Sequence, residues 1–196
     1  MTKIAIIVGS TRPGRNGKQV ADWVLEQASR REDAEFELVD LADYPLPLLD
    51  EPMPPSLGRY QHEHTRRWSE KIAEFDGFIF VTPEYNHSTS GVLKNAIDYL
   101  HKEWNNKAAA FVGYGGVGGA RAIEHLRLIL AELQVATVRQ TLTLSMLTEF
   151  ENFRTFAPGD YQIRFLNTLF DQLISWSQAL EGVRKPGHAD GAGLTA

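Results

Sequence analysis

Two segments of the chain carry the residue types best able to bind a ligand and support chemistry. The first is the glycine-rich stretch 9–17, and the second is the polar stretch 83–88. Each follows an apolar run and precedes a segment with helical spacing of apolar residues. In a parallel α/β sheet, such loops meet at the carboxyl ends of the strands, where ligands bind. The sequence therefore predicts one ligand site built from both loops.

The first loop, Gly-Ser-Thr-Arg-Pro-Gly-Arg-Asn-Gly, has the composition of an anion site. Backbone N–H groups converge in such a turn, and the helix that follows adds positive potential at its N-terminus. An arginine fork matches the geometry of phosphate oxygens. The helix is expected to open at Asn16 or Gly17. The residues predicted to bind or adjoin a phosphate are Ser10, Arg12, Arg15, Asn16, Gly17 and Gln19.

This loop is not the phosphate loop of nucleotide hydrolases. That motif would need glycine at position 12 and serine or threonine at position 19, where this chain has Arg12 and Gln19. Hydrolysis of a nucleoside triphosphate is therefore not expected. A solvated turn with two surface arginines remains the alternative to a phosphate site.

The second loop offers a polar edge for a flat heterocycle. Proline fixes one backbone angle, tyrosine can lie against a planar ring, and asparagine can hydrogen-bond to one. Glu84 is expected to brace the loop or to reach a partner subunit, and Ser88, Thr89 or Ser90 to cap the next helix. The predicted ring contacts are Pro83, Glu84, Tyr85, Asn86 and Ser88. A phosphate beside a flat ring indicates flavin mononucleotide (FMN), although this loop alone fits an ordinary connection equally well.

A third glycine-rich stretch, 113–118, matches the pattern G-x-G-x-x-G but not its context. The dinucleotide fingerprint belongs to the first strand–helix–strand unit, and an acidic residue should end the following strand. Here that strand is predicted to end at Arg139. We therefore expect Gly113, Tyr114 and Gly115 to approach the flavin, and NADP binding by this stretch remains the alternative.

Composition excludes several classes of function. The chain has 196 residues, a net charge of −5 and no cysteine, which rules out disulfides, thiolate metal sites and cysteine nucleophiles. There is no long basic run for nucleic acid, no stretch of membrane-span length and no signal-peptide pattern, so a cytoplasmic protein is expected. His62 and His64 flank Glu63, but a solvated helix start is favoured over a metal site. No metal and no catalytic side chain are predicted.

Apolar runs alternate with helical patterns five times along the chain, which predicts an α/β fold with a parallel sheet. Helices are expected on both faces, and strand 36–39 nearer an edge. The proline-rich stretch 42–58 is expected to be a long, semi-rigid loop. We predict one domain over 1–181 and a tail over 182–196. The expected strands are 4–8, 36–39, 78–81, 108–112 and a short 135–138.

Large apolar side chains near the second loop indicate an assembly. Leu93, Ile97 and Leu100 share one helical stripe, and Tyr99 and Trp104 add apolar surface beyond what one sheet face needs. A homodimer or homotetramer is therefore expected. Elsewhere, Trp68 and Trp176 are predicted to be core residues because of their helical spacing.

Four motifs together resemble the NAD(P)H-dependent FMN reductases, a family with quinone, chromate and azo-dye reductases. They begin at Gly9, Pro83, Gly91 and Gly118, and read GSTR, PEYN, GVLKNAID and GGAR. The resemblance covers roughly residues 1–180. It implies a flavodoxin-like fold with a five-stranded parallel sheet in the order 2-1-3-4-5.

The same resemblance implies bound FMN, with NADPH or NADH as hydride donor. Hydride would pass to the flavin and then to a small acceptor, such as a flavin, a quinone, an azo dye or a metal oxyanion, in a ping-pong cycle. Many relatives carry a serine near Arg15-Asn16 and a proline before Gly91, where this chain has Ser90. The alternatives are a flavodoxin-like electron carrier and an FMN-binding module without nicotinamide turnover.

Overall fold

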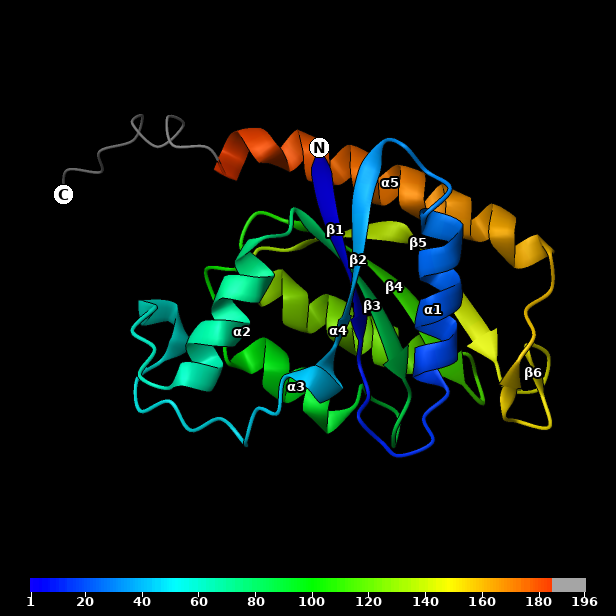
Figure 1. The fold of residues 1–196 in the computed structure, drawn as a ribbon, viewed down its shortest axis with the longest axis horizontal. Coiled ribbons are helices and arrows are strands. Elements are labelled where there is room, and N and C mark those ends of the chain that lie inside the picture. The colour runs from blue at the N-terminus through cyan, green and yellow to red at the C-terminus, as the bar shows by residue number, and fades with distance from the viewer. Residues whose placement is uncertain (185–196) are drawn as a thin grey trace.

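The computed structural model describes residues 1–184 and forms a parallel sheet flanked by helices (Figure 1). The strands are β1 (Thr2–Val8), β2 (Ala34–Asp40), β3 (Gly77–Pro83), β4 (Ala108–Gly115) and β5 (Ala136–Ser145). The helices are α1 (Gly17–Ala28), α2 (Glu63–Ala73), α3 (Gly91–Asp98), α4 (Ala120–Glu132) and α5 (Tyr161–Arg184). Two short 3-10 turns, η1 (Leu41–Asp43) and η2 (Pro55–Leu57), lie in the proline-rich stretch.

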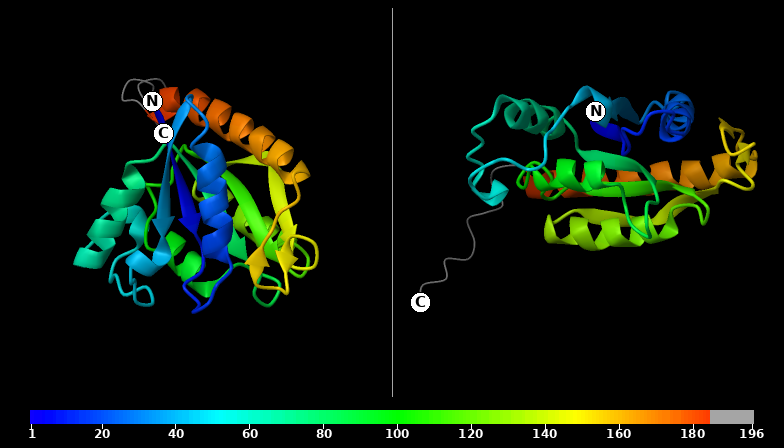
Figure 2. Two further views of the ribbon diagram at one scale, coloured as in Figure 1. Left: turned by 45° about the vertical axis from the view of Figure 1, so that its right-hand side comes forward. Right: turned by 90° about the horizontal axis from the view of Figure 1, so that it is seen from below.

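The strand order β2-β1-β3-β4-β5, with parallel pairing throughout, confirms the predicted sheet. The central strands form because their apolar runs are buried on both faces. On β1, Ile4, Ile6 and Val8 pack on the face covered by α1 and α5, while Ala5 and Ile7 pack on the face covered by α2, α3 and α4. Figure 2 shows the two helical layers on either side of the sheet.

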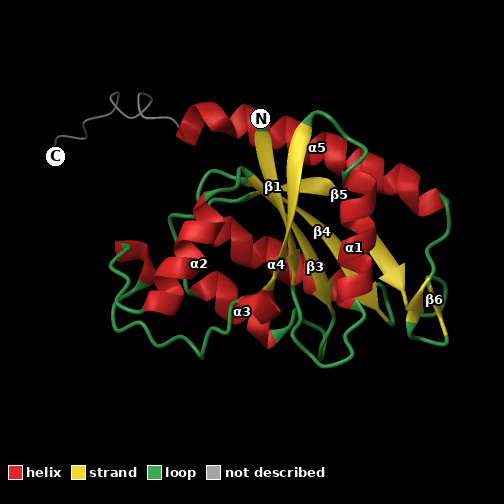
Figure 3. Ribbon diagram, viewed as in Figure 1, coloured by secondary structure: helices red, strands yellow, loops and turns green. Residues whose placement is uncertain are grey.

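Strand β5 and the segment after it differ from prediction. The fifth strand lies where the sequence predicted it, but its predicted end at residue 138 is wrong, because β5 has ten residues and continues to Ser145. A register shift between Ala109 and Phe111 of β4 accompanies this length. A hairpin of β6 (Phe150–Glu151) and β7 (Thr155–Phe156) follows and lies beside α1 (Figure 3). The sequence did not predict this hairpin.

The apolar stripe near the second loop is buried inside the chain itself. Leu93, Ile97, Leu100, Tyr99 and Trp104 are each at most 1% exposed. The Trp104 ring packs with Trp68, Phe78 and Phe80 on one face of the sheet, and the other four belong to the same apolar cluster. The inference that these side chains form a subunit contact is therefore wrong, because the sheet and its own helices cover them. The oligomeric state stays a prediction.

The last helix also departs from expectation in two details. Trp176 is 47% exposed, so its prediction as a core residue is wrong, whereas Trp68 is fully buried as predicted. Helix α5 continues to Arg184, past the predicted start of the tail, and the rest of the tail, 185–196, lies outside the described residues. None of the helices within residues 1–184 combines the length and the hydropathy that a membrane crossing requires.

Candidate functional site

A pocket of about 170 Å³ lies at the carboxyl ends of the strands and joins the two predicted loops. The first loop connects β1 to α1, and the second connects β3 to α3. The pocket is lined by residues of these loops, by the end of β4 and by one residue after β5: Arg12, Arg15, Asn16, Pro83, Glu84, Tyr85, Tyr114, Gly115 and Met146. The structure thus brings together eight of the predicted residues, and Met146 is a lining residue that the sequence did not indicate.

The two loops contact each other directly. The buried Ser10 hydroxyl lies 3.0 Å from the Tyr85 hydroxyl, and the Arg12 guanidinium carbon lies 5.9 Å from the centre of the Tyr85 ring. Gly9 donates its backbone N–H to the carbonyl of Val81 at 2.8 Å. A Cβ at Gly9 would lie 2.8 Å from that same carbonyl oxygen, so only glycine allows this approach.

The start of α1 presents donors without acceptors. Asn16 is the N-cap residue, yet its side chain makes no capping hydrogen bond, so the first N–H groups of the helix lack a side-chain cap. In the described part of the chain, the buried Nε of Arg15 and the buried hydroxyl of Tyr114 also have no hydrogen-bond partner. Buried polar groups are normally paired. A cluster of unpaired donors at a helix N-terminus fits a group that only accepts hydrogen bonds, as a phosphate does.

Arg15 is oriented by a partner that the sequence did not reveal. Its Nη2 forms an ion pair with the carboxylate of Asp40, at the end of β2. The Asp40 carboxylate also accepts a hydrogen bond from the backbone N–H of Ala42 at 3.0 Å. Arg15 is therefore fixed from one side, and its charge is partly offset before any ligand binds.

Asn16 and Gln19 are predicted near a phosphate, but their amides hold the β6–β7 hairpin. Asn16 Nδ2 donates to the Phe153 carbonyl at 3.0 Å. Gln19 Nε2 donates to the Arg154 carbonyl at 2.9 Å, and Gln19 Oε1 accepts from the Phe156 N–H at 3.1 Å. Gln19 is not among the pocket-lining residues. Both side chains thus connect the first loop to the hairpin.

The second loop is a tight turn closed by its own backbone. Tyr85 and Ser88 exchange N–H···O bonds of 2.9 and 3.1 Å, and Asn86 and His87 between them have φ angles of 50° and 67°. Asparagine and histidine adopt this left-handed conformation more readily than most residues. The Ser88 hydroxyl contacts His125 Nδ1 at 2.9 Å. The helix cap is Ser90, whose hydroxyl accepts from the Leu93 N–H at 3.2 Å.

Glu84 connects the second loop to the start of α4 through Arg121, which corresponds to the predicted role of stabilising the loop. Its buried carboxylate accepts hydrogen bonds from Arg121 Nε at 2.6 Å and from the Arg121 backbone N–H at 3.1 Å. Arg121 Nη1 also lies 2.8 Å from His87 Nε2. Burial acts to raise the pKa of Glu84, but the hydrogen bonds and charge of Arg121 outweigh it, so the pKa lies below its usual value.

Replacement of Arg121 by alanine is expected to lower the free energy of unfolding by about 1 kcal/mol at neutral pH. This estimate is smaller than for a buried ion pair, because Arg121 is partly exposed and solvent screens its charge. Because the folded pKa of Glu84 is lowered, its stabilising contribution is complete above the unfolded pKa and is lost as the pH falls through the folded pKa. The difference between wild type and Arg121→Ala should therefore shrink in acid. Urea unfolding between pH 7 and pH 3 measures it.

The matched control is Arg30→Ala, since Arg30 forms an ion pair with Glu26 in which both side chains are largely exposed. That pair should contribute little at any pH. A stability difference for Arg121→Ala that stays constant across this pH range would contradict the assigned role of Glu84.

Close packing requires glycine at Gly113, in the third glycine-rich stretch, and at Gly119, directly after it. A Cβ at Gly113 would lie 2.6 Å from the Gly118 carbonyl oxygen, and one at Gly119 would lie 2.8 Å from Gly113 Cα. The turn between β4 and α4 therefore needs these glycines to close upon itself. Gly115 and Tyr114 do line the pocket, but Gly113 is not among its lining residues.

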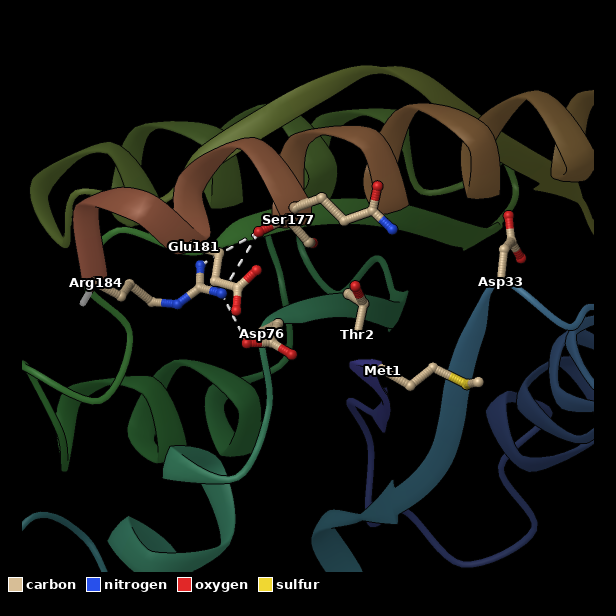
Figure 4. Close-up of a pocket in the computed structure, with 8 residues that line it drawn as sticks. Met1, Thr2, Asp33, Asp76, Ser177, Glu181 and Arg184 are labelled. Atoms are coloured by element: carbon tan, nitrogen blue, oxygen red, sulfur yellow. Dashed lines mark hydrogen bonds and ion pairs between the residues drawn. The ribbon is translucent and has the colours of Figure 1, made fainter.

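A second pocket, of about 400 Å³, lies at the opposite end of the sheet (Figure 4). Its charged groups already have partners in the protein. Arg184 Nη2 contacts Asp76 at 2.7 Å, and its Nη1 donates to the Asn106 carbonyl at 2.9 Å. Asp76 also accepts from the Lys3 N–H at 2.9 Å. These contacts anchor the end of α5 to the sheet, and we assign this pocket a structural role.

A family model described as NADPH-dependent FMN reductase matches residues 2–149, more than half of the chain. The chain belongs to the NADPH-dependent FMN reductase family. The match covers both loops of the pocket and the turn between β4 and α4, and it ends before the β6–β7 hairpin. The family predicted from the four motifs is thus confirmed for this FMN reductase chain.

Several known proteins resemble this FMN reductase chain over most of its length. An NAD(P)H-dependent FMN reductase of Schizosaccharomyces pombe is 43% identical over 146 residues, which cover 72% of this chain and 73% of that protein. A 2-hydroxy-1,4-benzoquinone reductase of Burkholderia sp. is 33% identical over 187 residues, which cover 89% and 95%. The solved structure of FerB, an NAD(P)H:(acceptor) oxidoreductase from Paracoccus denitrificans, matches with a TM-score of 0.71 at 23% identity, covering 91% and 98%. This structural match confirms the fold.

Proposed function

We propose that the protein is an FMN-dependent oxidoreductase that uses NAD(P)H to reduce a small acceptor. One observation carries this conclusion: a single pocket joins the first loop, with its unpaired donors at the start of α1, to the polar edge of the second loop. Such a pocket suits a ligand with an anionic end and a flat ring. Membership of the FMN reductase family supports the same ligand.

The residues present fit FMN at both ends. Ser10, Arg12, Arg15 and the start of α1 would hold the phosphate, and the unpaired Nε of Arg15 is a donor that it would satisfy. Pro83, Glu84, Tyr85 and Asn86 would border the ring, with Gly115 from β4. When bound, FMN accepts a hydride from the nicotinamide and reduces the acceptor.

The protein contributes binding and orientation rather than proton transfer. Among the lining residues, Glu84 is held ionised by Arg121, which lowers its pKa. Burial raises the pKa of Tyr114 far above its usual value, so its phenol keeps its proton. Neither group exchanges a proton near neutral pH, and no lining side chain is assigned as a catalytic acid or base.

The names of relatives support a small-molecule acceptor, since one is a 2-hydroxy-1,4-benzoquinone reductase and another an FMN-dependent NADPH-azoreductase. We also propose a cytoplasmic homodimer or homotetramer with one domain over 1–181. The apolar side chains available for subunit contacts are those exposed on the chain, such as Leu48, Leu57 and Leu128.

The purified protein is expected to retain about one FMN per chain after incubation with excess FMN and desalting. Absorbance of the flavin against the protein band measures this ratio. Steady-state oxidation of NADPH with a quinone then separates a reductase from an electron carrier, which would bind FMN but not turn over nicotinamide. A protein that retains no flavin at micromolar concentration would contradict the proposed function.

A further inference from the structure

Tyr114 has a buried hydroxyl for which no group of residues 1–184 provides a hydrogen-bond partner. The residue stands near the end of β4 and is 6% exposed, and its hydroxyl has no hydrogen-bond partner. The side chain reaches the first residue of α1, because a Cβ at Gly17 would lie 2.5 Å from the Tyr114 oxygen. The hydroxyl therefore lies against the start of α1, where the first loop ends.

The surroundings of this hydroxyl are rich in positive charge. Burial and the neighbouring Tyr85 raise the pKa of Tyr114, and the charges of Arg12 and Arg15 and the nearby Ser10 hydroxyl act against that shift. The Ser10 hydroxyl lies 3.0 Å from the Tyr85 hydroxyl, and the Tyr114 hydroxyl makes no hydrogen bond within residues 1–184. Tyr114 is thus a protonated phenol, ready to donate, among two arginines and a helix N-terminus.

A hydroxyl of this kind lowers the stability of the protein without a ligand. A buried donor that loses water and gains no partner is unfavourable, whereas a phenyl ring of the same shape is neutral or stabilising. Gly17 must also remain without a side chain to leave room for the oxygen. The unpaired hydroxyl gains a hydrogen bond, and the space kept free at Gly17 serves that bond, when a hydrogen-bond acceptor occupies the pocket that Tyr114 lines.

We propose that Tyr114 is a specificity residue, whose hydroxyl donates a hydrogen bond to the cofactor phosphate and so favours FMN over riboflavin. This inference rests on the proposed function and deepens it. It places the Tyr114 hydroxyl at the phosphate end of the ligand, whereas the sequence predicted only that residues 113–115 approach the flavin. A phosphate fits as the acceptor because Arg12 and Arg15 line the same pocket, and the buried Nε of Arg15 also has no hydrogen-bond partner within residues 1–184.

Tyr114→Phe removes only the hydroxyl, and we expect it to weaken FMN binding without lowering the stability of the flavin-free protein. Affinity for FMN, measured by quenching of flavin fluorescence, should fall about tenfold, while affinity for riboflavin should change less than about twofold. The melting temperature of the flavin-free variant should equal or exceed that of wild type. Inorganic phosphate should raise the melting temperature of wild type more than that of Tyr114→Phe.

Tyr99→Phe is the matched control, because Tyr99 is also buried but its hydroxyl bonds to Asp50 and the Pro47 carbonyl at 2.9 and 3.1 Å. This variant should lower the melting temperature and leave FMN affinity unchanged. Equal losses for FMN and riboflavin in Tyr114→Phe, or no loss for FMN, would overturn the role in phosphate recognition. A wild type that binds neither flavin would overturn the proposed function, and the phosphate measurement would then decide the role of Tyr114 alone.

Discussion

Replacement of Arg12 by alanine is expected to lower the affinity for FMN about ten- to a hundredfold. Arg12 lines the pocket, and the ion pairs and hydrogen bonds found within residues 1–184 leave its guanidinium free for a ligand. A hydrogen bond to a charged group contributes about 1.5–3 kcal/mol, which corresponds to this range of affinity. Riboflavin has no phosphate and should lose much less. Fluorescence titration of both flavins measures the two changes.

Lys18→Ala is the control for the loss of one positive charge near the start of α1. Lys18 forms an exposed ion pair with Asp22 on the same helix and does not line the pocket. Its removal should change FMN affinity less than about threefold, since solvent screens exposed charges. Equal losses of FMN and riboflavin in Arg12→Ala would show that Arg12 acts on the ring, through its contact with Tyr85.

Replacement of Gly119 by alanine is expected to lower the free energy of unfolding by about 3 kcal/mol. Its φ of 75° is strained for any residue with a Cβ, which costs about 1–3 kcal/mol. The new Cβ would also lie 2.8 Å from Gly113 Cα and Tyr114 N, and overpacking of this kind costs about 1–3 kcal/mol. Denaturant unfolding of the flavin-free protein measures the change.

Gly116 provides an internal control three residues earlier in the same turn. A Cβ there meets nothing within 4 Å, and its φ is not among the positive values. Gly116→Ala should therefore change stability by less than about 0.5 kcal/mol. If Gly119→Ala were as stable as Gly116→Ala, the close packing of the turn between β4 and α4 would not hold in solution.

The fold was largely predictable because the central strands are continuous apolar runs. Ile4–Val8 and Phe78–Val81 are buried on both faces, and such runs have no other common explanation in an α/β pattern. Strand β5 was harder, because it is an edge strand in which exposed Arg139 and Thr143 alternate with buried Val138, Leu142 and Leu144. From the sequence alone, residues 139–145 resemble a polar loop, because their pairing with β4 is not apparent.

The site was predictable where position along the chain determines the contact. Residues that follow β1 and β3 must meet at one edge of the sheet, and they do so in the pocket. The partners of Asn16, Gln19 and Arg15 were not predictable, because they depend on side chains from distant segments. Asn16 and Phe153 are separated by 137 positions, and no local pattern marks their hydrogen bond.

The hairpin anchored by Asn16 and Gln19 has a consequence for the order of events during synthesis on the ribosome. Strands β1, β2 and β3 with their helices are complete in the first half of the chain, and N-terminal regions emerge first. The pocket, however, also requires Tyr114 and Met146, and the hairpin reaches Asn16 only once Phe153 has been translated. We therefore expect the pocket and its anchored hairpin to be complete only after residue 153 has been translated, so that FMN does not take part in the folding of β1, β2 and β3.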